Sequence, residues 1–186
     1  INSILSIYKQ TKLVDFEIIV IDNNSTDDSK KNLKEKFPNI LIKENNQNLG
    51  FAAASNQGIK LSKGKLILLL NPDTIILNGA LDKVSQFIRT TNSADLVGCR
   101  LVNEDGSLQP SCRSFPTIWN HFVESFYLYK IFPKSKFFGK YHMSNFHHNR
   151  TEKVDSVMGA FMMFKKELID DIGYFDERFF MYSEET

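Results

Sequence analysis

Two acidic segments of the sequence stand where apolar runs end. Asp22 closes the run Ile18–Ile21, and Asn71-Pro72-Asp73 closes the run Leu66–Leu70. A carboxylate placed like Asp22 can accept hydrogen bonds from a nucleobase or a ribose, with neighbouring Asn and Ser side chains in support. A carboxylate placed like Asp73, beside an amide oxygen, can hold Mg²⁺, which takes one or two protein oxygens and fills its other positions with phosphate and water. An ordinary turn at either position is the alternative that these residues alone leave open.

A third acidic segment is the pair Glu184-Glu185, which follows the aromatic-rich run Phe179–Tyr182. Adjacent carboxylates beside aromatic rings favour a raised pKa in one of them, which a general base working near neutral pH requires. The alternative is a pair of surface charges close to the end of the sequence. The four histidines form no H-x-x-H or triad pattern, and the two cysteines lack metal-ligand spacing. We therefore expect packing or surface roles for the histidines and cysteines.

Strands and helices alternate along the first hundred residues. Apolar runs predict the strands, whereas capping residues and apolar stripes predict the helices. The predicted strands cover 17–21, 40–43, 66–70 and 95–102, and the predicted helices cover 4–8, 25–36, 52–61 and the residues after 78, with a hairpin turn at 103–106. This alternation is typical of βαβ units and a mostly parallel sheet, whose strands present their carboxyl ends at one edge. Asp22 and Asp73 should therefore face one crevice.

Two details of this alternation are specific enough to test. The helix starts are predicted at Ser25 and Asn78, whose side chains can cap free backbone N–H groups. Leu66–Leu70 gives the strongest strand signal, and because it is aliphatic on both faces we expect it at the centre of the sheet.

The second half of the sequence is rich in aromatic residues. Many of the 16 phenylalanines lie between Phe115 and Phe180, and an amphipathic helix is predicted over 117–129. Lys130–Lys153 then carries six basic residues against one acidic residue, with three histidines in addition. Aromatic side chains interleaved with lysines indicate a surface that meets anionic phosphates or a membrane face. A solvated basic loop is the alternative.

Composition limits the function further. A net charge of +1 over 186 residues argues against a protein that binds nucleic acid by bulk electrostatics. The longest apolar run, Leu66–Leu70, is far shorter than the ~20 residues of a membrane span, and no signal peptide precedes the first predicted helix. We expect a cytoplasmic chain whose contact with a membrane is peripheral, at the inner face.

Together these motifs resemble glycosyltransferase family 2, inverting nucleotide-sugar enzymes of the GT-A fold, and especially its rhamnosyltransferase-like branch. The matching stretches keep the family's order and cover most of the chain: Ile18–Asp28, Asn48–Gly58, Leu69–Thr74, Val97–Ser114 and Gly159–Glu185. The resemblance implies an α/β, Rossmann-like, mostly parallel sheet flanked by helices, with an aromatic-rich segment on the acceptor side. It implies a single domain over 1–186, with a nucleotide-binding half over 1–114 and an acceptor-side half over 115–186.

The resemblance also implies roles for individual residues. The nucleotide-binding set is Asp22, Asn24, Asn48, Gly50, Asn56, Asn71 and Asp73. Asp73 would also hold a divalent cation, Mg²⁺ or Mn²⁺. Gly159 and Ala160 would lie under the donor sugar and the acceptor, and Glu185, with Glu184 as the alternative, would be the catalytic base. The implied partners are a nucleotide-sugar donor, with rhamnose as one candidate sugar, and a glycan or lipid-linked acceptor in cell-surface polysaccharide synthesis, with no nucleic acid.

The sequence departs from the family's pattern in two ways. Position 185 is Glu where the family more often has Asp, which moves the base by one methylene. The family's first strand is also absent, because Ile1 already lies in the first predicted helix, and we expect a domain truncated at both ends. A fragment that binds a nucleotide-sugar without catalysis is therefore one alternative. A sugar nucleotidyltransferase is another, although the Gly-rich basic loop expected of that class is not visible here.

Overall fold

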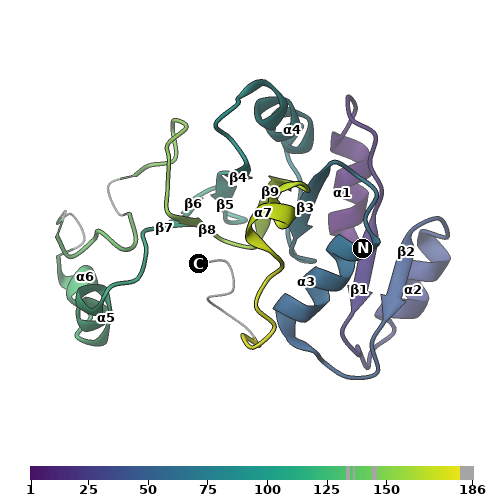
Figure 1. Cartoon of the computed structure of the whole chain (residues 1–186), viewed down its shortest axis with the longest axis horizontal. Helices are drawn as coiled ribbons and strands as arrows, with labels where there is room; N and C mark the ends of the chain where they lie inside the picture. Colours follow the sequence, from purple (N-terminus) through teal and green to yellow (C-terminus); the bar gives the residue numbers. More distant parts are fainter. Residues whose placement is uncertain (133–134, 136, 144–145, 181–186) are drawn as a thin grey trace. The chain divides into compact units, whose positions relative to one another are not determined.

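The computed structural model describes residues 1–132, 135, 137–143 and 146–180 of the chain (Figure 1). Two compact units divide the chain. The first contains Ile1–Val97 and the described part of Gly159–Glu185, and the second contains Gly98–Met158. The polypeptide therefore leaves the first unit after Val97 and returns to it at Gly159.

The first unit holds most of the predicted strand and helix alternation. Its elements are α1 (Asn2–Gln10), β1 (Ile19–Asp22), α2 (Ser29–Lys36), β2 (Leu41–Glu44), α3 (Gly50–Leu61), β3 (Leu66–Leu70), α4 (Ala80–Thr90), β4 (Leu96–Gly98), β9 (Phe161–Lys165) and α7 (Leu168–Ile172). Strands β1 and β2 pair in parallel, with Ile19 opposite Leu41. A separate three-stranded sheet has the order β3-β9-β4, in which β9 runs antiparallel to β3. The α/β class is confirmed, but the sheets are mixed rather than mostly parallel, because β9 enters from a distant part of the sequence.

Strand β9 takes the central position that the sequence predicted for β3. The four residues Phe161–Phe164 are all buried, whereas four of the five residues of β3 are only half-buried. The prediction that β3 is central is therefore wrong for the described sheet, in which β3 is an edge strand. The central position was predicted from the aliphatic residues of β3 alone, and the sequence does not indicate which strand lies beside it.

Both predicted helix starts are wrong, and for the same reason. Asn24 and Asn78 adopt left-handed backbone conformations, with φ of 69° and 53°, so the chain is still turning after each of them. Helix α2 begins at Ser29 behind Asp28, and α4 begins at Ala80 behind Gly79, and neither N-cap residue makes a side-chain capping bond. The two positions are turn residues that precede the helices.

Helix α4 packs through the predicted apolar stripe. Leu81, Val84 and Ile88 are all buried. Beside them the Asp82 carboxylate accepts hydrogen bonds from the backbone N–H groups of Lys12, at 2.8 Å, and Leu13, at 3.0 Å. These bonds hold the pKa of Asp82 below its ordinary value. The carboxylate thereby joins α4 to the segment that leads into β1.

The second unit is built from short pieces. Its elements are β5 (Leu101–Val102), β6 (Leu108–Gln109), β7 (Cys112–Arg113), α5 (Ile118–Ser125), α6 (Leu128–Ile131) and β8 (Ser156–Val157). Strands β5 and β6 form the predicted hairpin, in which Gly106 has a φ of 80° and its N–H donates to Asn103 O. The strand predicted over 95–102 is divided between β4 and β5.

Helix α5 exposes most of its apolar face. The Thr117 hydroxyl caps the helix by accepting from Asn120 N–H at 3.1 Å, and Val123 is buried. Ile118, by contrast, is 91% exposed. Five aromatic side chains, which we call the aromatic surface, are also exposed: Trp119, Phe122, Phe126, Phe132 and Phe137. No helix in the described part of the chain is long and apolar enough to cross a membrane.

Candidate functional site

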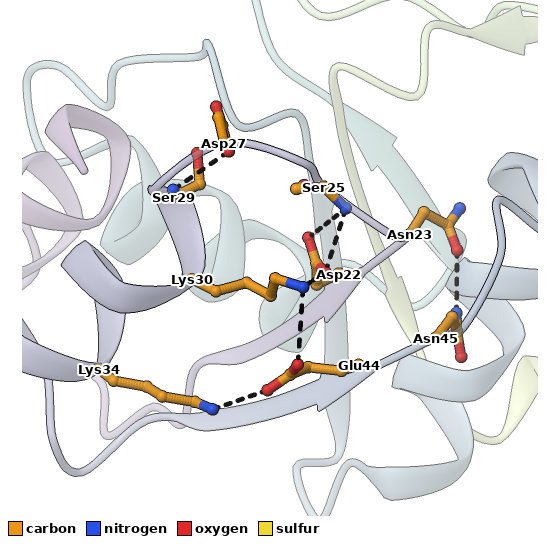
Figure 2. Close-up of polar contacts among 9 residues, drawn as sticks. All are labelled: Asp22, Asn23, Ser25, Asp27, Ser29, Lys30, Lys34, Glu44 and Asn45. Atoms are coloured by element: carbon orange, nitrogen blue, oxygen red, sulfur yellow. Dashed lines mark hydrogen bonds and ion pairs between the residues drawn. The ribbon is translucent and has the colours of Figure 1, made fainter.

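Asp22 ends β1 and is held in a turn (Figure 2). Its side chain is 7% exposed, and both carboxylate oxygens accept from Ser25 N–H at 3.3 Å. The Lys30 ammonium lies 3.7 Å from Asp22 Oδ2 and 3.8 Å from Glu44 Oε2. Lys34 donates to Glu44 Oε1 at 2.7 Å, and this bond holds the pKa of Glu44 below its ordinary value. Two lysines of α2 thus balance two carboxylates at the carboxyl ends of β1 and β2.

A pair of asparagines ties these strand ends to the start of α3. The Asn23 amide donates to Gly50 O at 3.0 Å and accepts from the Asn45 amide at 2.9 Å (Figure 2). The Asn45 backbone N–H donates to Asp22 O at 2.9 Å. Asn24, the next residue, is exposed and left-handed. Sequence reasoning singled out Asn24 and missed Asn23 and Asn45, although an Asn two residues after the end of each predicted strand was the available signal.

The start of α3 is in close contact with the last described segment of the chain. Asn48 Oδ1 accepts from Gly50 N–H at 2.9 Å, and Gly50 has a φ of 85°. Phe51 N–H donates to Phe180 O at 2.9 Å, and a Cβ at Gly50 would collide with the same carbonyl. Only glycine therefore fits at position 50. Glu184 and Glu185, four and five residues beyond Phe180, lie outside the described residues.

Asn56, on the same helix, holds this last segment in place. Its side chain is 1% exposed, and its amide nitrogen donates to Phe175 O and to Glu177 Oε1, each at 2.9 Å. Its amide oxygen accepts from Phe175 N–H at 3.0 Å. Both polar atoms of the side chain are therefore bonded within the protein, and a contact of Asn56 with a nucleotide stays a prediction.

Gly159-Ala160 contacts both α3 and the end of β3. A Cβ at Gly159 would lie 3.1 Å from the ring of Phe51. Ala160 O accepts from Asn71 N–H at 3.2 Å and from the Thr74 hydroxyl at 3.3 Å. A continuous series of contacts thus runs from Asn23 through the start of α3 to Gly159-Ala160 and Asn71.

Asp73 is exposed, and within the described ranges its carboxylate makes no hydrogen bond or ion pair. No group of three His, Cys, Asp or Glu side chains that could hold a metal is found among those residues. One exposed carboxylate, two residues after Asn71 in the sequence, still fits a hard cation that takes its other oxygens from a diphosphate and from water. These oxygen ligands fit Mg²⁺ or Mn²⁺ that is also bound by a substrate. They do not fit a cation that protein ligands alone surround.

The neighbours of the two strand-end carboxylates line one cavity. Asn23, Phe51, Asn71 and Pro72 all contribute to it, and its volume is about 810 Å³. Asp22 and Asp73 themselves are not part of its wall. The ends of β1 and β3 therefore share a cavity, and whether both carboxylates meet one ligand stays a prediction.

Comparison with known proteins shows the family of the chain. The model of the family described as "Glycosyl transferase family 2" matches residues 1–173. The chain belongs to glycosyltransferase family 2. An N-acetylglucosaminyl-diphospho-decaprenol L-rhamnosyltransferase of Mycobacterium tuberculosis is 23% identical over 181 residues, which cover 91% of this chain and 58% of that protein. The chain thus spans little more than half the length of this relative.

Solved structures show the fold. TarS 1–349 of S. aureus in complex with UDP aligns with 99% of this chain and 48% of its own, with a TM-score of 0.61 and 18% identity. A mannosyltransferase of Pyrobaculum calidifontis in complex with GDP-Man and Mn²⁺ aligns with 94% of this chain and 43% of its own, with a TM-score of 0.58 and 17% identity. The predicted GT-A fold is confirmed.

Proposed function

We propose that this chain forms part of an inverting glycosyltransferase, which moves a sugar from a nucleotide-sugar donor to a glycan or lipid-linked acceptor in cell-surface polysaccharide synthesis. Rhamnose is the first candidate sugar, because the Mycobacterium tuberculosis relative is a rhamnosyltransferase with a lipid-diphosphate acceptor in its name. The observation that carries the proposal is the series of contacts from Asn23 to Asn71, which joins two strand ends, the start of α3 and Gly159-Ala160.

In this proposal the first unit binds the donor. Asp22 accepts hydrogen bonds from the nucleobase or the ribose, with the exposed Asn24 beside it. Asn48 and Gly50 shape the loop that faces the nucleotide, and Asn56 fixes the segment after Phe175 against the same helix. Asn71 and Asp73 lie at the diphosphate, where small and polar residues allow a close approach.

Asp73 would hold the divalent cation, with the Asn71 amide oxygen as its neighbour. When bound, Mg²⁺ or Mn²⁺ offsets the negative charge of the diphosphate. The exposed position of Asp73 suits this role, because a carboxylate that has no partner among the described residues is available to a ligand.

Glu185 is the proposed base. The acceptor oxygen forms a bond to the anomeric carbon, the bond from that carbon to the diphosphate oxygen breaks, and its electron pair leaves with the diphosphate. The hydroxyl proton passes to the Glu185 carboxylate. Attack from the face opposite the diphosphate inverts the anomeric centre. Glu184 is the alternative, since neighbouring side chains in an extended segment point to opposite sides.

The aromatic surface of the second unit is the proposed contact with the membrane that carries a lipid-linked acceptor. Lys130 lies 5.0 Å above the ring of Tyr127, and both side chains belong to the same short helical region. Aromatic rings with ammonium groups beside them suit the headgroup layer of an anionic bilayer. Burial lowers the pKa of His142, which disfavours a positive charge on this ring. Lys134 and Lys136 lie outside the described residues.

Vesicle binding tests the membrane contact. Binding should require phosphatidylglycerol in phosphatidylcholine vesicles and should fall as salt is raised. The double variant Phe122→Ser, Phe126→Ser should reduce it, whereas Ile75→Ser, at an exposed apolar residue of the first unit, should not. Equal binding to neutral vesicles, or no binding to either kind of vesicle, would contradict the membrane contact and would favour the alternative that Lys130–Lys153 is a solvated loop.

A thermal-shift panel tests the donor proposal. UDP-, dTDP- and GDP-sugars are compared with and without Mn²⁺ or Mg²⁺, since a ligand that binds only the folded state stabilises it by about 2.7 kcal/mol at 100 times its Kd. One nucleotide class should stabilise the chain, and more strongly with cation. Stabilisation without transfer to any acceptor would favour the non-catalytic alternative, and no stabilisation by any donor would contradict the proposal.

A further inference from the structure

Helix α3 holds the segment Phe175–Phe180 at two points. The buried Asn56 side chain is bonded to the backbone of Phe175 at the start of this segment. Phe51 N–H, nearer the start of the helix, donates to Phe180 O at 2.9 Å. Residue numbers rise along the segment as they fall along the helix, so the two run antiparallel, and Figure 1 shows this part of the chain beside α3.

A turn fits the segment to the spacing of the helix. The two contact points on α3 are five residues apart, about 7.5 Å along an α-helix, whereas five extended residues would span about 17 Å. The chain folds back between them, because Phe179 N–H donates to Asp176 O at 3.1 Å. Arg178 Nε donates to both carboxylate oxygens of Asp176 at 2.9 Å, and these bonds lower the pKa of Asp176 to about 2. Asp176 therefore shapes the turn, and its neighbour Glu177 reaches the helix.

The bonding pattern of Asn56 is matched to this turn. Its amide nitrogen carries two N–H groups, and Phe175 O and Glu177 Oε1 each accept from that nitrogen at 2.9 Å. Its amide oxygen accepts from Phe175 N–H at 3.0 Å. Release of the segment would leave these polar atoms of a buried side chain unpaired, which is costly. The exposed Glu177 thus makes a specific bond to a side chain inside the protein.

We propose that Glu177 and Asn56 form a clamp that positions the segment leading to the catalytic base, so that both are positioning residues. Phe180 is held on α3, and Glu184 and Glu185 follow it by four and five positions. A fixed start limits the conformations open to the next few residues, and a base that is already oriented loses less entropy in the reaction. The catalytic role of the clamp rests on the proposed function, whereas the clamp itself requires no nucleotide.

A reversal of polarity tests the clamp. Asn56→Asp replaces the two N–H groups by an oxygen, which faces the Glu177 carboxylate, and should release the segment. Glu177→Gln keeps an oxygen that can accept from Asn56 and is the matched control. In the double variant the new amide can donate to the new carboxylate, so the bond is restored with the opposite polarity.

Residue-resolved hydrogen exchange of the chain without nucleotide measures the release. Exchange at Phe51 N–H reports on its bond to Phe180, five residues from the altered side chain. It should be at least about tenfold faster in Asn56→Asp, and within about threefold of the wild-type rate in Glu177→Gln and in the double variant. Exchange at Ser62 N–H, at the other end of α3, should stay within about threefold in all four proteins.

Transfer kinetics test whether the clamp acts on the base. With the donor identified by the thermal-shift panel, Asn56→Asp should lower kcat by at least about tenfold and change the KM and the calorimetric Kd of the donor by less than about threefold. The double variant should recover kcat. If the wild-type chain transfers no sugar and the exchange pattern is as expected, the proposed function is contradicted and the clamp stands.

A second variant keeps the test valid if Asn56→Asp does not fold. Glu177→Ala removes one bond at an exposed residue and should speed exchange at Phe51 N–H by at least about fivefold.

Several results would overturn the clamp. Unchanged exchange at Phe51 N–H in Asn56→Asp or Glu177→Ala would show that the bond does not hold the segment, and the absence of rescue in the double variant would show that the two side chains do not act as a pair. Equally faster exchange at Ser62 N–H would mean a general loss of stability. A weaker calorimetric Kd that Glu177→Gln does not rescue would make Asn56 a nucleotide ligand, as the sequence predicted.

Discussion

The two units differ in whether they bury the apolar stripe of a helix. Helix α4 of the first unit buries its apolar stripe, with Ile88 only 2% exposed. Helix α5 of the second unit has a similar stripe, but Phe126, at the helix end, is 60% exposed, and its ring lies tilted against the exposed ring of Phe122, with the centroids 4.6 Å apart. Periodicity in the sequence thus predicts a helix and its apolar face, and does not say whether the protein or an external partner covers that face. We propose donor binding for the first unit and an external contact for the second.

The largest expected effect is on catalysis. Glu185→Gln should lower transfer by about 100- to 10,000-fold, because the proton acceptor is lost, and should leave nucleotide affinity unchanged. Initial rates and calorimetric Kd values of the same preparation check this. Glu184→Gln is the matched control, and loss of transfer in that variant alone would move the role to Glu184.

The difference in burial between the units predicts a difference in stability. Ile88→Ala should lower the free energy of unfolding by about 2–5 kcal/mol, because it leaves a cavity in a packed core. Phe126→Ala should change it by no more than about 0.5 kcal/mol, as is typical of surface positions. Urea titration measures both. Similar losses in the two variants would show that the aromatic surface is part of a core.

The next effect concerns the nucleotide. Asp22→Asn should weaken nucleoside diphosphate binding by about 1–3 kcal/mol, the cost of a lost charge-assisted hydrogen bond. The control is Asp28→Asn, which changes the same charge at an exposed residue that makes no side-chain capping bond. Equal affinities of the two variants would make Asp22 a turn residue only.

A comparison of alanine substitutions at two glycines distinguishes the cost of backbone strain from the cost of a close contact. Gly50 and Gly106 have nearly equal φ angles, 85° and 80°, but Phe180 O blocks a Cβ at Gly50, and nothing lies within 4 Å of one at Gly106. Both substitutions to Ala should cost about 1–2 kcal/mol from the left-handed backbone. Gly50→Ala should cost about 1–3 kcal/mol more and weaken nucleotide binding, since α3 must move from Phe180. Equal losses of stability would show that this contact is unimportant.

Sequence reasoning found the elements of the first unit from α1 to β4, apart from their exact bounds, and the roles of the site residues stay predictions. The aliphatic runs at β1 and β3 located Asp22 and Asp73, and Asp-Gly located the hairpin at Gly106. It did not find that β9 lies beside β3, because strand order depends on contacts between residues about a hundred positions apart. It also missed the amides of Asn23 and Asn45, since a hydrogen bond between two loops leaves no periodic signal.

The helix starts show the same limit on a smaller scale. Ser25 and Asn78 have the side chains of capping residues, but left-handed residues delay both helices. The Ser25 N–H is bound by the Asp22 carboxylate, so the residue belongs to the strand-end turn. Capping propensity predicts that a helix is near, and tertiary contacts decide the residue at which it begins.

Calorimetric titration of nucleoside diphosphate into the wild-type chain and Asp73→Ala, each with and without Mn²⁺, tests the central claim most directly. The claim is that Asp73 joins a cation and a diphosphate at the end of β3. The wild-type chain should bind more tightly with Mn²⁺, and Asp73→Ala should lose that gain while keeping the cation-independent affinity. The same Mn²⁺-dependent gain in both proteins, or no binding to the wild-type chain under either condition, would contradict the account.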